Sequence, residues 1–325
     1  MSVALPTDKR KNKKKEDMKK FLSMLALVLC ALSVKAQSED VTASLMEQFI
    51  QAKPLVVVPP ATFNGKELPE KKSRKVTLTT VKSVDNDFGD EAVDAWYSKY
   101  GSGCPYREYW FGDLKETPET ARFFNMPLTL GNLWRGYVEV HDGYCLFVYG
   151  TPDFPERQCG YNPYLAVVTN PEVTRIERVI DFSKVRSAFL DKVIRVGSFS
   201  QYAVPSYGGC TFEGNTMYVC MAHRTYSSSS GGKNAYLMAV DLTTGKIQWM
   251  TKPLTCNSQF VVTGNSIICG YGFSGEMHYV YVVDKNTGRR ASKLVVKKSP
   301  ELFSVIGNKV YSRMYAYDYT FNLKK

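Results

Sequence analysis

A block of sequence in the C-terminal half of this 325-residue chain recurs at an interval of 43 residues. Residues 236–249 read YLMAVDLTTGKIQW, and residues 279–289 read YVYVVDKNTGR. The Asp-x-x-Thr-Gly motif that begins at Asp241 therefore returns at Asp284. Self-similarity at an interval of this length is typical of proteins built from stacked structural repeats, and it restricts the possible folds more than any other feature of the sequence.

A second motif, a Gly-Asn dipeptide between alternating apolar residues, keeps the same interval. It occurs at Gly264 and at Gly307, with a further copy at Gly214 and a fainter Asp-Gly copy at Gly143. Gly-Asn supplies the left-handed backbone of a tight hairpin turn, and Asp-x-x-Thr-Gly is a turn in which the Asp side chain bonds nearby backbone groups. Each repeat thus predicts four antiparallel strands, which make one blade of a β-propeller.

The repeat therefore predicts an all-β protein, a β-propeller of four-stranded antiparallel blades. A single blade cannot bury both of its faces, so the blades must pack on one another. We expect blades over residues 134–182, 205–252 and 256–298, and a last blade that begins at Glu301. The sequence reaches Lys325 before that last blade has a fourth strand.

An N-terminal strand could complete the last blade. Residues 75–84 alternate between polar and apolar side chains and are suited to this; the alternative is a truncated propeller without independent function. Residues 85–130 are rich in aromatic side chains and could hold another blade, which would give about five. The expected organisation is an N-terminal extension with a signal peptide over 1–36, a partly disordered leader over 37–74 and the propeller over 75–325.

The segment Ala239–Trp249 resembles the Ala-x-Asp-x-x-Thr-Gly-Lys-x-x-Trp repeat of pyrroloquinoline-quinone-like (quinoprotein-like) β-propellers. The resemblance covers residues 200–325, and more loosely 130–182. It implies a fold rather than a chemistry, because the family includes enzymes and non-catalytic scaffolds, and it gives Trp249 a role in blade packing. The family's quinone-binding enzymes hold a disulfide between adjacent cysteines against the cofactor. This sequence has no Cys-Cys dipeptide, so we expect no quinone.

The positive charge of the chain is concentrated at its start. The formal net charge is +11, but nine of the 42 Lys and Arg residues lie within residues 1–36, so we do not expect a nucleic-acid partner. Two lysines after Met18, the apolar stretch 21–32 and the small residue Ala36 follow the pattern of a secretory signal peptide. We expect cleavage near Ala36, with Met18 a possible true start. The mature protein would be periplasmic or secreted, without a membrane-spanning segment.

The chain has eight cysteines, of which Cys30 would leave with the signal peptide. An oxidising compartment permits disulfides, and the odd number that remains leaves at least one thiol unpaired. Cys104 and Cys159 lie in turn-rich loops and could pair, and Cys210 and Cys220 could face each other across a hairpin. Strand-like surroundings favour burial as small hydrophobes for Cys145, Cys220 and Cys269. No cysteine or histidine spacing predicts a zinc site.

In a propeller, the loops between the second and third strands of each blade share one face with the blade-to-blade connections. In this sequence those loops are irregular and carry aromatic, Arg and His side chains, a composition common at recognition surfaces. The candidate ligand-binding residues are Arg157, His223, Arg224, Tyr226, Tyr271, Phe273 and His278.

No nucleophile elbow, phosphate loop or metalloprotease motif occurs, and we expect neither a metal nor another cofactor. The leading hypothesis is an exported, monomeric, non-catalytic module that binds a protein partner or a glycan at the loop face. The alternative is a propeller-fold hydrolase or lyase that acts on polysaccharide, which would need two carboxylates about 5–10 Å apart. An aromatic face with few carboxylates would favour the binding module.

Overall fold

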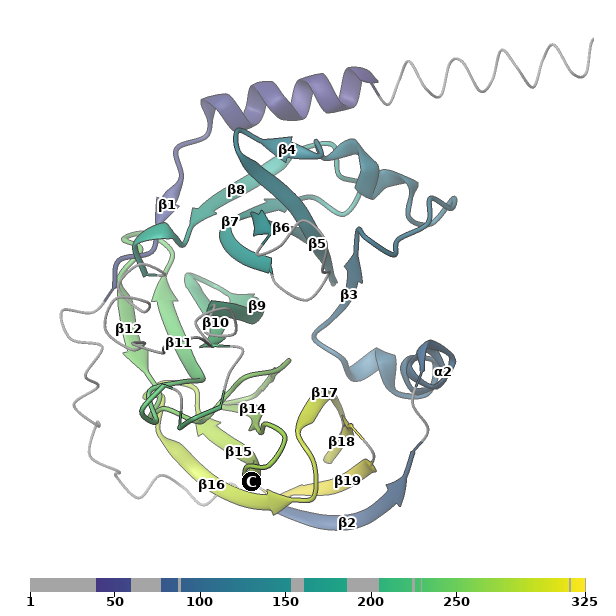
Figure 1. Ribbon diagram of the computed structural model, residues 1–325, viewed down its shortest axis with the longest axis vertical. Coiled ribbons are helices and arrows are strands. Elements are labelled where there is room, and N and C mark those ends of the chain that lie inside the picture. The colour runs from purple at the N-terminus through teal and green to yellow at the C-terminus, as the bar shows by residue number, and fades with distance from the viewer. Residues whose placement is uncertain are drawn as a thin grey trace, which may run out of the picture.

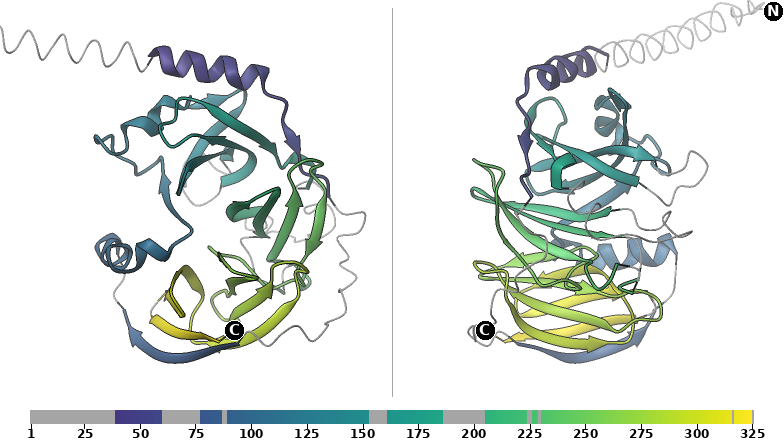
Figure 2. Two further views of the ribbon diagram at one scale, coloured as in Figure 1. Left: turned by 180° about the vertical axis from the view of Figure 1, so that it is seen from behind. Right: turned by 60° about the vertical axis from the view of Figure 1, so that its left-hand side comes forward.

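The strands of this protein form four sheets arranged around a common centre, as Figure 1 shows. The computed structural model describes residues 39–59, 77–86, 89–152, 161–185, 205–223, 226–228, 230–315 and 317–324. In the right-hand view of Figure 2 the sheets lie one above another, with the first sheet at the top and the fourth at the bottom. The chain is a β-propeller with four-stranded antiparallel blades, which confirms the prediction from the repeat.

The second and third sheets follow the repeat most closely, because strands adjacent in sequence are adjacent in each sheet. The second sheet consists of β9 (Pro205–Glu213), β10 (Thr216–His223), β11 (Tyr236–Asp241) and β12 (Ile247–Met250). The third consists of β13 (Val261–Thr263), β14 (Ser266–Tyr271), β15 (His278–Asp284) and β16 (Arg290–Val296).

Both predicted turns are present. Gly264, between β13 and β14, has a φ of 55°, a left-handed conformation that glycine adopts without steric cost. After β11, Asp241 Oδ1 accepts hydrogen bonds from the backbone nitrogens of Thr243 (3.0 Å) and Thr244 (2.8 Å). The same arrangement recurs after β15 at Asp284. The repeated motifs therefore fix where each strand ends.

The fourth sheet is completed by an N-terminal strand, as predicted. Its strands are β17 (Pro300–Ile306), β18 (Lys309–Met314), β19 (Tyr317–Lys324) and β2 (Thr77–Asp85). β2 runs antiparallel to β19, with Leu78 opposite Leu323 and Asp85 opposite Tyr317. The side chain of Leu78 is buried in the core shared with the third sheet. The strand that the repeat lacks at its C-terminal end is thus supplied from about 240 residues earlier in the chain.

The first sheet is larger than the others. Its central strands are β5 (Leu133–His141), β6 (Tyr144–Pro152), β7 (Tyr161–Thr169) and β8 (Ile176–Asp181). β1 (Leu55–Val56) adds to β8 in parallel, and both β3 (Tyr106–Trp110) and β4 (Thr129–Leu130) pair with β5. The helix of residues 39–51 packs on this sheet and buries Leu45 completely, so part of the expected leader belongs to the propeller.

The aromatic-rich segment 85–130 does not make a further blade, and the described residues contain four sheets where about five were expected. The segment forms α2 (Asp90–Tyr100), the short helices η1 (Gly101–Gly103) and η2 (Ala121–Asn125), and the two added strands β3 and β4. Its aromatic side chains pack against existing sheets: the Tyr100 ring stacks on that of Tyr311, with the ring centroids 4.2 Å apart. α2 and η1 lie between the fourth sheet and β3 (Figure 1).

Trp249 has the blade-packing role that the family resemblance implies. Its ring is buried between the second and third sheets, and its Nε1 donates a hydrogen bond to the Lys285 carbonyl oxygen at 3.1 Å. Near the centre, Gln259 connects three parts of the ring: Nε2 donates to the Tyr106 carbonyl oxygen (3.1 Å), and Oε1 accepts from the backbone nitrogen of Phe303 (3.2 Å). No helix in the described part of the chain is long and apolar enough to cross a bilayer.

The predicted Cys210–Cys220 disulfide is wrong. In the β9–β10 hairpin, Cys210 lies opposite Val219, so Cys220, the next residue along, has its side chain on the other face of the sheet. Cys210 accordingly belongs to the core between the first and second sheets, and Cys220 to the core between the second and third. For the other predicted pair, Cys104 Sγ lies 3.8 Å from the Tyr100 carbonyl oxygen, and Cys159 is outside the described residues.

Candidate functional site: a groove between the third and fourth sheets

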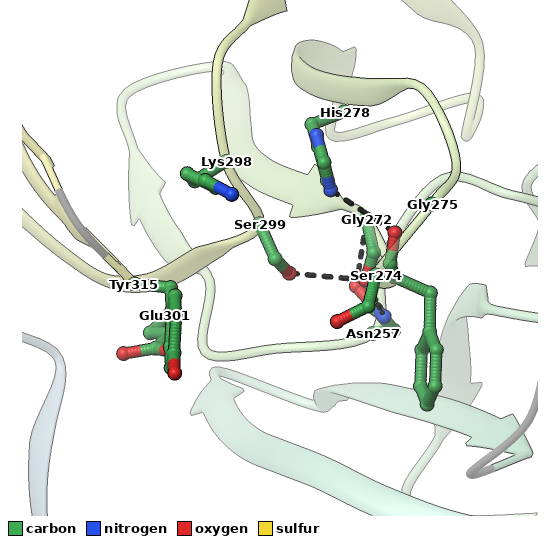
Figure 3. A pocket seen from close by; sticks show the side chains of 10 residues that line it. Asn257, Gly272, Ser274, Gly275, His278, Lys298, Ser299, Glu301 and Tyr315 are labelled. Atoms are coloured by element: carbon green, nitrogen blue, oxygen red, sulfur yellow. Dashed lines mark hydrogen bonds between the residues drawn. The ribbon is translucent and has the colours of Figure 1, made fainter.

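The loop face holds an open groove of about 320 Å³ where the third and fourth sheets meet (Figure 3). The β14–β15 loop, the start of β15, the β16–β17 connection and the ends of β17 and β18 contribute its walls, and the β12–β13 connection contributes one residue. The lining residues are Asn257, Gly272, Phe273, Ser274, Gly275, His278, Lys298, Ser299, Glu301 and Tyr315.

Three chain segments meet at the Gly272 backbone in the groove. Asn257 Nδ2 donates to the Gly272 carbonyl oxygen at 2.7 Å, and Ser299 Oγ donates to the same oxygen at 3.0 Å. The Gly272 backbone nitrogen in turn donates to Asn257 Oδ1 at 3.2 Å. A Cβ atom on Gly272 would overlap the His278 ring and lie 2.9 Å from Ser299 Cα. Glycine is therefore required for these segments to approach so closely.

His278 presents a neutral ring to the groove. Desolvation lowers the pKa of His278 and outweighs the hydrogen bonds to the Phe273 and Lys297 backbones, which raise it; the Lys298 ammonium group adds to the lowering. Nε2 donates a hydrogen bond to the Phe273 carbonyl oxygen at 3.1 Å, which fixes the ring against the β14–β15 loop. In the neutral ring with a proton on Nε2, Nδ1 is a hydrogen-bond acceptor. His278 is thus suited to accepting a hydrogen bond from a ligand hydroxyl or amide.

Among the residues that line the groove, Glu301 is the only one with a carboxylate. Although the residue as a whole is exposed, desolvation of its carboxyl group raises the pKa of Glu301, and the nearby Arg313 opposes this rise. Lys298 supplies a cation, and Tyr315, at 58% exposure, supplies a large aromatic surface. The groove therefore combines an aromatic ring with several hydrogen-bonding groups and one acid.

A second set of contacts ties the β14–β15 loop to the β10–β11 loop of the neighbouring sheet. Glu276 Oε1 accepts hydrogen bonds from the backbone nitrogen (2.6 Å) and Oγ (2.7 Å) of Ser227, and the Tyr271 hydroxyl donates to Oε2. Burial and the Glu276 carboxylate raise the pKa of Tyr271. The Tyr226 and Phe273 rings meet edge to face, with their centroids 5.1 Å apart. These contacts hold one wall of the groove in place.

Of the seven residues predicted from the sequence, Phe273 and His278 line the groove. Tyr271 is 2% exposed and Tyr226 packs on Phe273, so both support the loops. β10 ends at His223, whose side chain is not described, and Arg157 and Arg224 are outside the described residues. The sequence analysis missed Asn257, Lys298, Ser299, Glu301 and Tyr315. Asn257, Lys298 and Ser299 lie in blade-to-blade connections. These connections share the face of the loops from which the candidates were chosen, so the sequence could have offered them too.

A buried polar pair also lies near the centre of the ring, beside a cavity of about 490 Å³ that His141 lines. His141 Nε2 lies 3.1 Å from Glu139 Oε2, and the Cys210 backbone nitrogen donates to the same oxygen at 3.4 Å. Burial raises the pKa of Glu139, as does the nearby Glu108, and burial lowers the pKa of His141 to about 3. Neither residue was among the candidates. Glu139 has no exposed surface, so a polysaccharide chain cannot reach it in this structure.

Comparisons with known proteins give no family for this chain. No family model matches the sequence, and no curated protein resembles it significantly in sequence. Similar solved structures include a quinohemoprotein alcohol dehydrogenase from Pseudomonas putida HK5, at 14% identity over 54% of this chain with a TM-score of 0.32. This chain spans 27% of the length of that protein.

Two further solved structures show a likeness of the same order. BamB from Moraxella catarrhalis is 10% identical over 60% of this chain and 70% of its own, with a TM-score of 0.30. The Bacteroides ovatus xyloglucan protein GH43B is 14% identical over 56% of this chain and 37% of its own, with a TM-score of 0.33. With identities and TM-scores this low, none of the three structures indicates the chemistry of this protein. The chemistry has to be argued from the residues of the groove.

The described residues contain no group of three or more His, Cys, Asp or Glu side chains that could hold a metal ion. The chemistry available in the groove is hydrogen bonding through Asn257, Ser299 and His278, with stacking on Tyr315. Such a surface is suited to contacting a ligand, and its lining residues include one carboxylate, fewer than hydrolysis of a glycosidic bond by paired acids requires.

Proposed function

We propose that this protein is a non-catalytic propeller module that binds a carbohydrate chain in the groove between the third and fourth sheets. The observation that carries the proposal is the combination of the exposed Tyr315 ring with hydrogen-bonding side chains from separate segments and one carboxylate, Glu301. Ligand sites commonly join apolar and aromatic surface to a few polar groups that fix orientation.

A sugar ring suits this surface for a physical reason. Its faces carry C–H groups that pack on the electron-rich face of an aromatic ring, and its edges carry hydroxyl groups. His278 Nδ1 and the Glu301 carboxylate can accept hydrogen bonds from hydroxyls, and Lys298 can donate to a sugar oxygen. The groove is open to solvent, so a bound unit need not be the end of a chain.

The groove favours binding over hydrolysis or lysis. Glycosidases that use paired carboxylates place them on both sides of the scissile bond, whereas Glu301 is alone among the residues that line this groove. The other polar pair, Glu139 with His141, has one carboxylate, and Glu139 is fully buried. A bound polysaccharide is therefore expected to dissociate without being cleaved.

The proposed place of action is outside the cytoplasm, in the periplasm or as a secreted monomer. Support comes from the signal-peptide pattern, whose residues lie outside the described part of the chain. N-terminal mass spectrometry of protein recovered from the periplasm or medium would test export. A mature N-terminus at Gln37 is expected, and an intact N-terminus on protein retained in the cytoplasm would contradict it.

Binding is tested by calorimetry with cello-, xylo-, manno- and chito-oligosaccharides. We expect one class to bind and Tyr315→Ala to weaken it at least tenfold, equivalent to about 1.4 kcal/mol. The matched control is Trp134→Ala, which removes an exposed ring at the first sheet and should leave affinity unchanged. Equal loss in both variants, or no binding by any class, would contradict the proposal. Release of reducing ends from a bound oligosaccharide would instead support the hydrolase, and a Tyr315-dependent interaction with a purified protein would replace the glycan as ligand.

A further inference from the structure

The positive charge of the chain beyond residue 36 is concentrated near its C-terminal end. Residues 285–325, which include β16 to β19, contain ten Lys and Arg residues and two acids. Residues 37–284 contain 23 Lys and Arg residues and 26 acids. The excess of positive charge outside residues 1–36 therefore comes entirely from residues 285–325, and this segment supplies four of the ten residues that line the groove. We refer to residues 285–325 as the basic segment.

Some cations of the basic segment are used within the fold. Arg290 Nε donates a hydrogen bond to Thr255 Oγ1 at 2.9 Å, on the connection that leads into the third sheet. Lys285 Nζ lies 2.8 Å from Glu213 Oε2, which belongs to the second sheet. Charge-assisted contacts of this kind hold a side chain in place. Arg290 and Lys285 therefore support the packing of the sheets and are not available to a ligand.

Lys298 differs from the lysines beside it in the basic segment. The ammonium groups of Lys293 and Lys297 lie over the rings of Tyr279 and Tyr317, at 3.7 and 4.6 Å from the ring centroids. Lys298 is exposed, and among the described residues no hydrogen bond, ion pair or ring contact occupies its ammonium group. Lys298 also lines the groove (Figure 3). The groove thus contains a cation that is available to an anionic group of a ligand.

Glu301, the acid of the groove, does not neutralise Lys298. Among the described residues these two side chains form no ion pair, although both line the groove. The cation that acts on Glu301 is instead the buried Arg313, which opposes the rise in pKa that desolvation of the carboxyl group causes. The negative charge of Glu301 is thus partly balanced from inside the protein, whereas Lys298 has no counter-ion among the described residues.

We propose that the carbohydrate bound in the groove is anionic, and that a carboxylate or sulfate group on the chain pairs with the Lys298 ammonium group. Such a chain keeps sugar faces that can pack on Tyr315, and it adds a charge that Lys298 can neutralise. The basic segment around the groove raises the local concentration of an anionic chain near the third and fourth sheets. The inference rests on the proposed function and specifies the chemical class of its ligand.

The test compares oligosaccharides that differ in charge alone. Oligomers of glucuronate, mannuronate and galacturonate are each titrated into the full chain by calorimetry, beside their methyl esters, which keep the sugar rings and lose the charge. We expect one acid form to bind at least tenfold more tightly than its ester at low salt, equivalent to about 1.4 kcal/mol. Added salt should reduce this difference, because it screens exposed charges. A sulfated galactan oligosaccharide, titrated in parallel, distinguishes sulfate from carboxylate as the preferred anion.

Substitutions of two lysines locate the charge that matters. Lys298→Gln should remove most of the preference for the anionic form and leave the affinity for the neutral ester largely unchanged. Lys298→Arg keeps the charge and should keep the preference. The matched control is Lys293→Gln, which alters an exposed lysine of β16 that does not line the groove and should leave both affinities unchanged. Because all three variants alter exposed side chains, a cooperative melt of each is expected and verifies that it folds.

Four outcomes would count against a proposal, and they differ in which one they affect. Binding of neutral oligosaccharides as tight as that of the anionic ones would overturn the inference and leave the proposed function standing. Equal losses in Lys298→Gln and Lys293→Gln would also overturn it, because the attraction would then come from the whole basic segment. Polyglutamate that binds as tightly as the anionic oligosaccharides would show a surface for polyanions in general and would overturn the assignment to carbohydrate. No binding of any oligosaccharide, charged or neutral, would refute the proposed function itself.

Discussion

The indole ring of Trp249 packs directly on the backbone of Gly288. A Cβ atom at Gly288 would overlap the six-membered part of the indole. Trp249 ends the Asp-x-x-Thr-Gly repeat of the second sheet, and Gly288 is the glycine of the same motif in the third. The motif thus serves twice: its glycine forms the turn of its own sheet and leaves space for the tryptophan of the sheet before.

This contact predicts a difference between two glycines of similar conformation. Gly288→Ala and Gly307→Ala both place a side chain at positive φ (70° and 62°), which costs about 1–2 kcal/mol. Only at Gly288 would the new methyl group meet another side chain, because nothing lies within 4 Å of a Cβ at Gly307. We expect Gly288→Ala to lower the free energy of unfolding by about 2 kcal/mol more than Gly307→Ala in urea titrations. Equal losses of unfolding free energy would show that the Trp249 ring moves aside for the new methyl group at little cost.

Completion of the fourth sheet by β2 predicts that Leu78 is far more sensitive to substitution than the exposed positions of that strand. Leu78 is buried in the core of the third and fourth sheets, and Val81 on the same strand is 51% exposed. Leu78→Ala should lower the free energy of unfolding by about 2–4 kcal/mol, and Val81→Ala by about 0.5 kcal/mol or less. Chemical denaturation measures both. A small effect at Leu78 would mean that β2 contributes little to the fourth sheet.

The buried Glu139 predicts a specific dependence of stability on pH. Because the pKa of Glu139 is raised in the folded protein, its stabilising contribution is complete below its ordinary pKa of 4.5 and is lost as the pH rises towards the folded value. Above about pH 7 the wild type should lose up to about 1.4 kcal/mol per pH unit from this group until the pH reaches the folded pKa of Glu139. His141, whose pKa is lowered, is neutral in both states in that window.

Glu139→Gln cannot ionise, so its free energy of unfolding should vary less steeply with pH across this window. Thermal melts of both proteins in a pH series measure the difference in slope. Parallel curves would show that Glu139 titrates in the folded protein as it does in the unfolded chain.

The Glu276 bridge predicts coupled mobility of two loops from neighbouring sheets. Glu276→Ala removes the acceptor for Ser227 and for the Tyr271 hydroxyl, which should lower the free energy of unfolding by about 1–3 kcal/mol. Hydrogen exchange of the Ser227 amide should also speed up. The control Glu116→Ala alters an exposed acid and should leave both quantities unchanged. Faster exchange confined to the β14–β15 loop would contradict the bridge.

The turns explain why so much of the fold could be read from the sequence. Asp241 and Gly264 act through local backbone geometry, so a motif of five residues or fewer determines them. The closing strand was also predictable from the strand-like sequence of residues 75–84, although Leu78 is the one buried side chain among residues 78–85. The blade count was not, since nothing local distinguishes the aromatic side chains of a new sheet from those, like Tyr100, that pack on an existing one.

The groove was less predictable because it depends on distances between segments far apart in sequence. Phe273 and His278 were found because the repeat already placed the β14–β15 loop, and the start of β15 that follows it, on the right face. Tyr271 also lies on that face, yet its hydroxyl is directed at Glu276 and is not available to a ligand. The wrong pairing of Cys210 with Cys220 has a similar origin: a shift of one residue in register moves a side chain to the opposite face.

The pairing of β2 with β19 also sets an order of events during synthesis. Asn86, which directly follows β2, bonds Asp318 in β19, and these residues are 232 positions apart. On the ribosome β2 emerges long before β19 and has no partner in its sheet until β19 has been made. Its hydrogen-bonding edge is open throughout that interval, when it could pair with another chain. The synthesis of β19 thus ends this exposure.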